Sequence, residues 1–301
     1  MTERHLSIYL DPTTLSQVRE GQHNFFARLI GALKAVDWGV NLHETGPIAR
    51  RDARNKPGYA LYHMEPPTHA RALTCRRSYV GAFWHIEDSA ERWEWPVAKA
   101  AFDADEIDGQ EAAKFFGIWK NRLYPGVNPT NERDLALIAL QGKLRDHRSF
   151  QAMSPIQMIE EVLARHAGPV VATLHPKEIY TADEIAALEQ IASRFSRFHF
   201  QLGGSPALLP KCQFVATQNS ALALEGYFLR KPAILFAKSE FHHIAGSVSR
   251  DGLEAAFQYR DQTPPVARYL YWLLQLNALN AGRPEFEERL RAHLKNFGWP
   301  I

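Results

Sequence analysis

Apolar residues along the chain fall into short runs that alternate with longer segments in which they recur at helical spacing. Residues 6–10 form the first run, and residues 24–36 follow it with the spacing of one helix face, so a strand, a loop and a helix open a βα unit. Further short runs, each bounded by proline, glycine or charged residues, predict strands at residues 40–43, 59–63 and 79–84. The N-terminal part of the chain is therefore predicted to be an α/β lobe.

A second series of apolar runs and helical segments begins near residue 134. The predicted strands are 134–141, 169–174, 198–202, 213–217 and 233–236, and the predicted helices are 155–165, 181–194 and 220–229. Strands that alternate with helices of this length indicate a parallel sheet with helices on both faces. Thr181 and Glu184 have the spacing of a capping box, which supports a helix start at Thr181. This part of the chain is predicted to form a second α/β lobe.

The segment between the two series differs from both. Residues 87–133 place tryptophans among charged residues, and Tyr124 opens a Tyr-Pro-Gly break, which predicts an excursion followed by a linker. At the end of the chain, residues 265–279 and 285–297 read as two helices that pack against the lobes. The predicted organisation is an N-terminal lobe over 1–130, a second lobe over 131–264 and C-terminal helices over 265–301.

Composition excludes several classes of protein. The chain has 301 residues, of which 46% are hydrophobic and 23% charged, as in a globular protein large enough for two lobes. Its 35 basic and 33 acidic residues give a formal net charge of +2, which is too balanced for a protein that binds nucleic acid through many phosphates. Two cysteines without CxxC spacing indicate neither a disulfide framework nor a structural zinc site. No signal-peptide core or membrane-spanning run stands out, so we expect a cytoplasmic protein whose membrane contact is at most peripheral.

Polar residues follow the predicted strands of the second lobe. The segment His175-Pro176-Lys177 follows one strand and Gln218-Asn219-Ser220 follows another, and in a parallel sheet these ends meet at the rim where ligands bind. The helix that starts at Ser220 offers free backbone N–H groups and the positive end of its dipole to a phosphate. Glu225 on that helix can accept hydrogen bonds from a ribose diol, and His175 can donate to a phosphoryl oxygen or protonate a leaving group. The alternative is a helix cap, an exposed glutamate and a loop histidine without function.

Several motifs in this half of the chain resemble a known family through their order and spacing. They are Leu137-Ile-Ala-Leu-Gln141-Gly, His147-Arg-Ser-Phe150, Ser154-Pro155 before a helix, Leu174-His175-Pro176, Gln218-Asn219-Ser220 with Glu225, and Arg230-Lys231-Pro232-Ala-Ile. Across approximately residues 134–245 they resemble the bacterial capsular polysaccharide synthesis and export proteins that act as Kdo transferases. Two positions depart from the pattern: Arg230 stands where glycine usually precedes Lys-Pro, and Phe241-His242-His243 replaces an expected aromatic pair.

The resemblance implies the GT-B fold of glycosyltransferases, with two Rossmann-like lobes and a cleft between them. It also implies that CMP-Kdo is the donor, that His175 and Ser220 hold the CMP phosphate, and that Glu225 holds the ribose. The residues assigned to the nucleotide-sugar site are His175, Pro176, Lys177, Gln218, Asn219, Ser220 and Glu225. The nucleotide-sugar is a substrate, so no separate cofactor is expected.

The first lobe has no motif that matches the family, so its catalytic group is sought by position. His23 precedes the first long helix, where glycosyltransferases of this architecture often face their acceptor, and it is the leading catalytic candidate beside His175. A carboxylate–histidine pair can abstract an acceptor proton. The competing groups near two other predicted strands are His63, Glu65, His85, Glu87 and Asp88.

The sequence therefore predicts a glycosyltransferase of capsule or surface polysaccharide synthesis that transfers a sugar from CMP-Kdo to a glycan or glycolipid. Its other expected contacts are peripheral, with the inner membrane or capsule-assembly proteins, and nucleic acid is not an expected partner. No metal site is predicted, because His242 and His243 are adjacent and lack a third ligand nearby. The alternatives are a nucleotide-sugar epimerase or hydrolase of the same fold and a non-catalytic binding or scaffold protein of capsule assembly.

Overall fold

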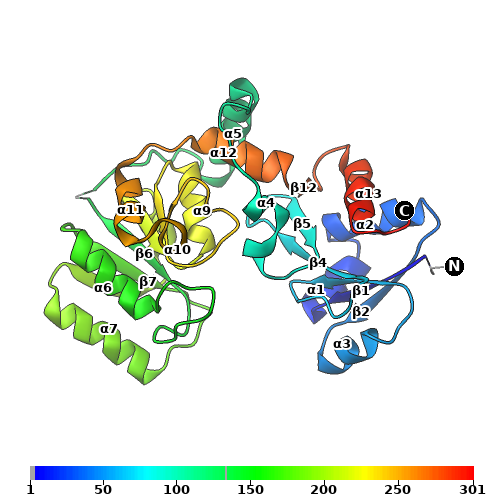
Figure 1. Cartoon of the computed structure of the whole chain (residues 1–301), viewed down its shortest axis with the longest axis horizontal. Coiled ribbons are helices and arrows are strands. Elements are labelled where there is room, and N and C mark those ends of the chain that lie inside the picture. Colours follow the sequence, from blue (N-terminus) through cyan, green and yellow to red (C-terminus); the bar gives the residue numbers. More distant parts are fainter. Residues whose placement is uncertain (1–3, 133) are drawn as a thin grey trace. The chain divides into compact units, whose positions relative to one another are not determined.

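Two six-stranded sheets organise the chain (Figure 1). The computed structural model describes residues 4–132 and 134–301, so residues 1–3 of the first predicted lobe and residue 133 of the predicted linker lie outside the described residues. Each sheet belongs to its own compact unit: unit 1 comprises Met1–Trp95 and Leu273–Ile301, and unit 2 comprises Pro96–Trp272.

Unit 1 is built on a sheet of strand order β12-β5-β4-β3-β1-β2. β1 pairs in parallel with β2 and β3, and β3 with β4, whereas β5 is antiparallel to both β4 and β12. The strands are β1 (His5–Leu10), β2 (Gly39–Glu44), β3 (Tyr59–His63), β4 (Ala72–Arg77), β5 (Phe83–Glu87) and β12 (Leu279–Asn280). The helices are α1 (Pro12–Arg19), α2 (Asn24–Lys34), α3 (Pro47–Ala53) and α13 (Phe286–Asn296), with a 3-10 turn at Arg92–Glu94.

Alternation along β1 separates the two faces of this sheet. Leu6, Ile8 and Leu10 are buried in a cluster that α2 and α13 complete with their own apolar side chains. On the other face the ring of Tyr9 stacks between those of His43 and Tyr62, at centroid distances of 5.0 and 4.7 Å. The apolar run that predicted a strand at residues 6–10 therefore contributes side chains alternately to the two faces of the sheet.

Unit 2 has the strand order β11-β10-β9-β6-β7-β8, and all of its named strand pairs are parallel. The strands are β6 (Ala136–Leu140), β7 (Val170–Leu174), β8 (Phe198–Leu202), β9 (Phe214–Thr217), β10 (Ala233–Leu235) and β11 (Gly246–Ser247). The larger helices are α5 (Gly109–Leu123), α6 (Pro155–Arg165), α7 (Ala182–Arg194) and α9 (Ala221–Phe228). The shorter ones are α4 (Pro96–Lys99), α8 (Ser205–Leu208), α10 (Val248–Asp251), α11 (Leu253–Gln258), a 3-10 turn at Tyr259–Asp261 and α12 (Val266–Leu270).

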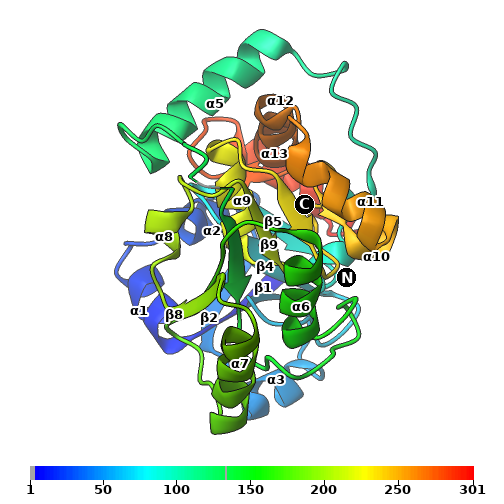
Figure 2. The same ribbon diagram turned by 90° about the vertical axis from the view of Figure 1, so that its left-hand side faces the viewer.

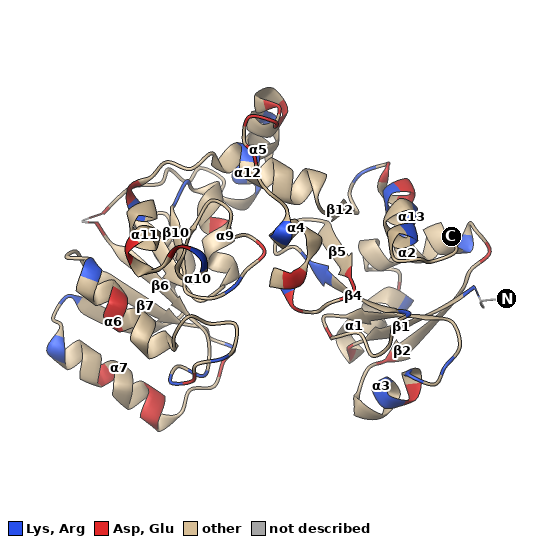
Figure 3. Ribbon diagram, viewed as in Figure 1, with Lys and Arg blue, Asp and Glu red and all other residues tan. Residues whose placement is uncertain are grey.

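Helices cover both faces of the unit 2 sheet. α6, α7 and α11 share one buried apolar cluster with alternate residues of the strands, and α6 and α7 lie side by side (Figure 2). α9 packs on β9 and against α5 and α12. Strands β6 to β10 carry no charged residue along their described length, and the charges of this unit lie on its helices and loops (Figure 3). The strands β6, β7, β9 and β10 are also apolar and almost entirely buried, as is typical of a parallel sheet covered on both faces.

Two Rossmann-like α/β units therefore confirm the predicted fold class. The unit boundaries differ from the predicted lobe boundary near residue 130, because α5 packs with α9 and α12 inside unit 2. The C-terminal helices are divided between the units: α12 belongs to unit 2, whereas α13 packs on α2 in unit 1. Within the described residues, no helix is long and apolar enough to cross a membrane.

Two predicted elements are wrong in detail. Of the strand predicted at residues 79–84, only the last two residues belong to β5, because Tyr79 and Gly81 adopt positive φ angles of 59° and 58° in the turn after β4. The helix predicted at residues 265–279 ends early: α12 passes into a π-helical turn at Tyr271–Leu276, and the chain then forms β12. Neither β4 nor the helices α1 and α5 had been predicted.

Candidate functional site

The strand order of unit 2 reverses between β6 and β9. From β6 the chain continues through β7 to β8 on one side, then crosses to β9 and continues to β10 on the other. Such a reversal leaves a crevice at the carboxyl ends of the two central strands, where open α/β sheets bind ligands. Residues 141–142 follow β6 and residues 218–220 follow β9. The structure thus brings one of the two predicted segments, residues 218–220, directly to the point where the strand order reverses.

His175 is the first residue after β7, the other neighbour of β6. Its side chain is exposed, as are Pro176 and Lys177. The backbone N–H of Lys177 donates to Nδ1 of the imidazole at 3.2 Å, and the Tyr180 hydroxyl accepts from the His175 N–H at 2.8 Å. Because Nδ1 accepts a hydrogen bond, the neutral ring carries its proton on Nε2. The loop therefore presents Nε2–H as a donor.

Ser220 is the N-cap of α9, and its hydroxyl accepts from the N–H of Leu222 at 3.3 Å. Asn219 donates through Nδ2 to the carbonyl of Lys238 at 3.2 Å. Gln218 is only 3% exposed, and its Nε2 donates to the Met153 carbonyl, while its buried Oε1 has no hydrogen-bond partner within residues 4–132 and 134–301. The three side chains thus hold the start of α9 in place, and Gln218 leaves one acceptor unused.

Glu225 lies one turn into α9, half-buried, and its Oε2 accepts a hydrogen bond from the Tyr124 hydroxyl at 3.1 Å. Burial raises the pKa of Glu225, and the hydrogen bond from Tyr124 partly offsets this. Burial, followed by the charge of Glu225, raises the pKa of Tyr124. Sequence reasoning missed Tyr124, because its Tyr-Pro-Gly context indicated only a break in the chain.

The side chain of Glu178 lies close to the backbone at the same edge of the sheet. A Cβ on Gly142 would lie 2.6 Å from Glu178 Oε2, so the glutamate lies close to the second residue after the end of β6. Beside it, Gly203 and Gly204 adopt positive φ angles of 69° and 83° after β8, and Ser205 donates to Thr173 Oγ1 at 2.8 Å. These glycines are required by the backbone conformation of the turn.

Other residues of the family-like motifs have structural roles. Lys231 is buried, and its ammonium group donates to the carbonyls of Thr130 and Cys212. His243 accepts from the Tyr269 hydroxyl at Nδ1 and donates from Nε2 to the Ala100 carbonyl, at 3.1 and 3.0 Å. Burial lowers the pKa of His243 to about 4, so this imidazole is neutral at physiological pH.

In unit 1, His23 and His63 line one cavity of about 370 Å³, together with Arg77 and Trp84. His63 Nδ1 lies 3.4 Å from Oδ2 of Asp11. Asp11 had not been singled out from the sequence. An acidic N-cap directly after a predicted strand, followed by Pro12, is the signal that could have identified it.

The other carboxylate candidates of unit 1 are held elsewhere. Glu65 bonds to the hydroxyl of Thr45 and forms an ion pair with Arg50 at 3.0 Å. His85 Nδ1 lies 3.4 Å from Glu87 Oε1, with both side chains almost fully buried. Asp88 is exposed at the end of β5. The structure does not bring these groups to the cavity of His23 and His63.

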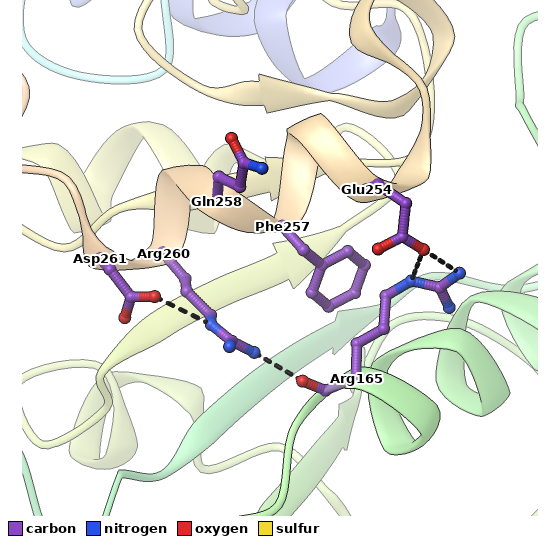
Figure 4. A pocket seen from close by; sticks show the side chains of 6 residues that line it. All are labelled: Arg165, Glu254, Phe257, Gln258, Arg260 and Asp261. Carbon is purple, nitrogen blue, oxygen red and sulfur yellow. Dashed lines mark hydrogen bonds and ion pairs between the residues drawn. The ribbon is translucent and has the colours of Figure 1, made fainter.

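A second cavity, of about 240 Å³, lies in unit 2 at the opposite edge of its sheet (Figure 4). It is lined by Arg165, which precedes β7, and by Asp261, which accepts from Gln213 just before β9. Arg165 pairs with Glu254 and Arg260 with Asp261, at 2.8 and 3.2 Å. These charges are already paired, and this cavity is separate from the predicted site residues.

Solved structures that are similar to this chain include two sugar-processing enzymes. The chain is similar to KpsC of Thermosulfurimonas dismutans, a beta Kdo 2,7 transferase, with a TM-score of 0.47 and 11% identity over 78% of this chain and 80% of that one. It is also similar to the UDP-GlcNAc 2-epimerase of Methanocaldococcus jannaschii, determined in complex with UDP-GlcNAc and UDP, with a TM-score of 0.38 and 10% identity over 97% of this chain and 99% of that one. No protein-family model and no curated protein sequence matches the chain. At these identities, neither similarity says which sugar or nucleotide this chain binds.

Proposed function

We propose that the chain is a glycosyltransferase whose unit 2 binds a nucleotide-activated sugar, CMP-Kdo, at the carboxyl edge of its sheet. The transferred sugar goes to a hydroxyl of a glycan or glycolipid in capsule or surface polysaccharide synthesis. The choice of CMP-Kdo rests on the motif resemblance across approximately residues 134–245. The choice of the site rests on this chain's own topology.

The observation that supports this site is the position of His175 and Ser220 beside the end of β6, where the strand order reverses. β7 and β9 both pair with β6, so their ends are two strand spacings apart, about 10 Å. A phosphate bound over the end of β6 is within side-chain reach of both. On one side it meets the Nε2–H of His175, and on the other it meets the backbone N–H groups and positive dipole end at Ser220.

Glu225 is suited to the ribose. Its Oε2 is engaged by Tyr124, whereas Oε1 has no hydrogen-bond partner in the part of the chain that the structure describes, so one carboxylate oxygen is available to a diol. Tyr124 holds the carboxylate in one orientation before the nucleotide binds. A group that is oriented in advance loses less conformational entropy on binding.

In the proposed transfer, the bond between the sugar carbon and the phosphate oxygen breaks, and its electron pair leaves with CMP. His175 Nε2–H donates a hydrogen bond to the departing phosphate, where negative charge grows. Glu178 near the end of β6 would repel that phosphate, so binding requires this exposed side chain to move aside.

Thermal unfolding with a panel of CMP, UDP, GDP and ADP tests the proposal. A ligand stabilises the state that it binds, so CMP is expected to raise Tm more than UDP or GDP at equal concentration. The same panel on Ser220→Ala protein controls for non-specific effects, because the shift should shrink when the cap of α9 is lost. Stabilisation by purine nucleotides alone would contradict the choice of donor.

A further inference from the structure

The loop between β6 and α6 contains a turn over residues 148–151. The N–H of Gln151 donates to the Arg148 carbonyl at 2.9 Å, and the N–H of Arg148 donates to Gln151 Oε1 at 2.8 Å. The guanidinium carbon of Arg148 lies 4.8 Å from the centre of the Phe150 ring. The turn and this ring contact therefore hold the arginine in place.

Hydrogen bonds tie this turn to the start of α9. Lys238, three residues after β10, donates its backbone N–H to the Phe150 carbonyl at 2.9 Å. The Lys238 carbonyl accepts from Asn219 Nδ2 at 3.2 Å, and Asn219 directly precedes Ser220, the N-cap of α9. The backbone of Lys238 thus joins the turn to the helix start, and all of these residues belong to unit 2.

Two donors on the turn, Arg148 Nε and Gln151 Nε2, are buried without a hydrogen-bond partner among residues 4–132 and 134–301. Gln151 is only 5% exposed, and the unpaired Oε1 of Gln218 bonds to neither donor. Within the same residues Arg148 forms no ion pair, whereas its neighbour Arg145 lies 4.0 Å from Asp183. Buried donors without acceptors cost stability, so such groups in a native fold point to a water, an ion or a ligand that accepts from them.

Lys238 adds a second positive charge beside the turn. It is the one exposed residue in the segment 231–241, all of which the structure describes. The next acid along the chain, Glu240, is only 4% exposed and accepts from the Ser239 hydroxyl at 3.4 Å. Asp146, on the same loop as Arg148, is exposed to solvent and forms no ion pair with either cation in the part of the chain that the structure describes. Both positive charges are therefore available to an anion.

We propose that Arg148 and Lys238 form an anion subsite beside the start of α9, which binds a second anionic group of the nucleotide-sugar. This inference rests on the proposed function, in which the phosphate itself lies at Ser220. The carboxylate of an acidic sugar has the required charge, and its two oxygens match the fork of a guanidinium. The second phosphate of a nucleoside diphosphate offers the same chemistry. The subsite thus favours a nucleotide with two anionic groups over a nucleoside monophosphate.

Three cytidine nucleotides with different anionic groups test the subsite. CMP carries one phosphate, CMP-Kdo adds a sugar with a carboxylate, and CDP adds a second phosphate. Titration calorimetry would give the affinity of each for wild type, Arg148→Gln and Lys238→Gln. The matched controls are Arg145→Gln on the same loop and Lys211→Gln, which removes an exposed lysine 3.6 Å from Glu132.

We expect wild type to bind CMP-Kdo more tightly than CMP, and that advantage should fall roughly 10-fold in Arg148→Gln, the usual effect of removing a charged hydrogen-bond partner. Lys238→Gln should lower the advantage as well, and its exposed position should leave the fold intact. The affinity for CMP itself and Tm should stay near wild-type values, and both controls should match wild type throughout. A loss confined to CDP would assign the subsite to a second phosphate and not to a sugar carboxylate.

Equal affinity of wild type for the three nucleotides, or an unchanged advantage in both variants, would overturn the subsite and leave the proposed function intact. If wild type binds no cytidine nucleotide, the proposed function fails, and inorganic phosphate then tests the subsite alone. The Nε–H signal of Arg148, identified in 15N spectra by its loss in Arg148→Gln, should shift with millimolar phosphate and not with chloride at equal ionic strength. A signal that does not move would show that this turn binds no anion.

Discussion

The hydroxyl of Tyr124 donates to Oε2 of Glu225 at 3.1 Å and joins the end of α5 to the second turn of the site helix α9. The two residues are 101 positions apart in the chain. The contact gives Glu225 a fixed carboxylate, which an exposed helix glutamate would not have. The helix α5 itself belongs to unit 2 through its packing with α9 and α12.

Glu225→Gln is expected to weaken CMP binding by on the order of 1–3 kcal/mol, because the ribose hydroxyls lose an ionised acceptor. The fold should persist, since glutamine can still accept from Tyr124. Titration calorimetry on wild type, Glu225→Gln and the control Glu189→Gln, an exposed change on α7, measures this effect. An unchanged CMP affinity in folded Glu225→Gln would show that the Glu225 carboxylate does not bind the nucleotide.

Unit 2 was predictable because its signals are local and mutually consistent. Short apolar strands, capping residues such as Thr181 with Glu184, and helices of ordinary length recur in order, and the helix 155–165 was predicted to the residue. The resemblance and the strand ends together placed His175 and Ser220 at the rim. In a parallel sheet the carboxyl ends of all strands lie at one edge, so residues that follow different predicted strands are expected to lie near one another.

What the sequence could not show depends on contacts between distant segments. β4 ends in Arg76 and Arg77, so its apolar run looked too short for a strand. The helix α5 buries only Ala112 and Phe115 of its own residues, so its pattern is weak. The Asp11–His63 pair joins residues 52 positions apart, and neither spacing nor composition indicates that β1 and β3 are neighbours.

Glu87 makes stability depend on pH. Burial raises its pKa to about 7 from an ordinary value of 4.5. Between these values the folded state keeps a proton that the unfolded state has lost, so the free energy of unfolding falls as pH rises through this window. The loss from this group is on the order of 3 kcal/mol and is complete above about pH 7.

Glu87→Gln has no such proton to lose. Relative to wild type, it should therefore gain stability between pH 5 and pH 8, which urea unfolding at the two values measures. Titrating groups that do not interact with Glu87 affect both proteins alike, so the difference reports Glu87 together with its neighbours His85, Asp88 and His293. A stability difference that stays constant with pH would contradict the raised pKa.

Arg230 occupies the position where the resembled family has glycine, and its φ angle is 56°. A residue with a Cβ is strained in this left-handed region, and glycine is not. Arg230→Gly is therefore expected to be more stable than Arg230→Ala by about 1 kcal/mol. Both variants lose the contact of the guanidinium with the Phe116 ring, at 4.9 Å. The difference between their thermal unfolding therefore measures the backbone strain at residue 230. Equal stability would argue against strain at this position.

The most direct test of the central claim is CMP release from CMP-Kdo with a Kdo-terminated glycolipid acceptor, measured on wild-type and His175→Ala proteins with matched circular dichroism. His175 is exposed, and among the described residues its ring bonds only within its own loop, so its removal should leave the fold intact. If its Nε2–H stabilises the departing phosphate, turnover should fall roughly 100- to 1000-fold. Equal rates in the two proteins would contradict that role, and a wild-type protein inactive with every CMP-sugar would contradict the proposed transferase itself.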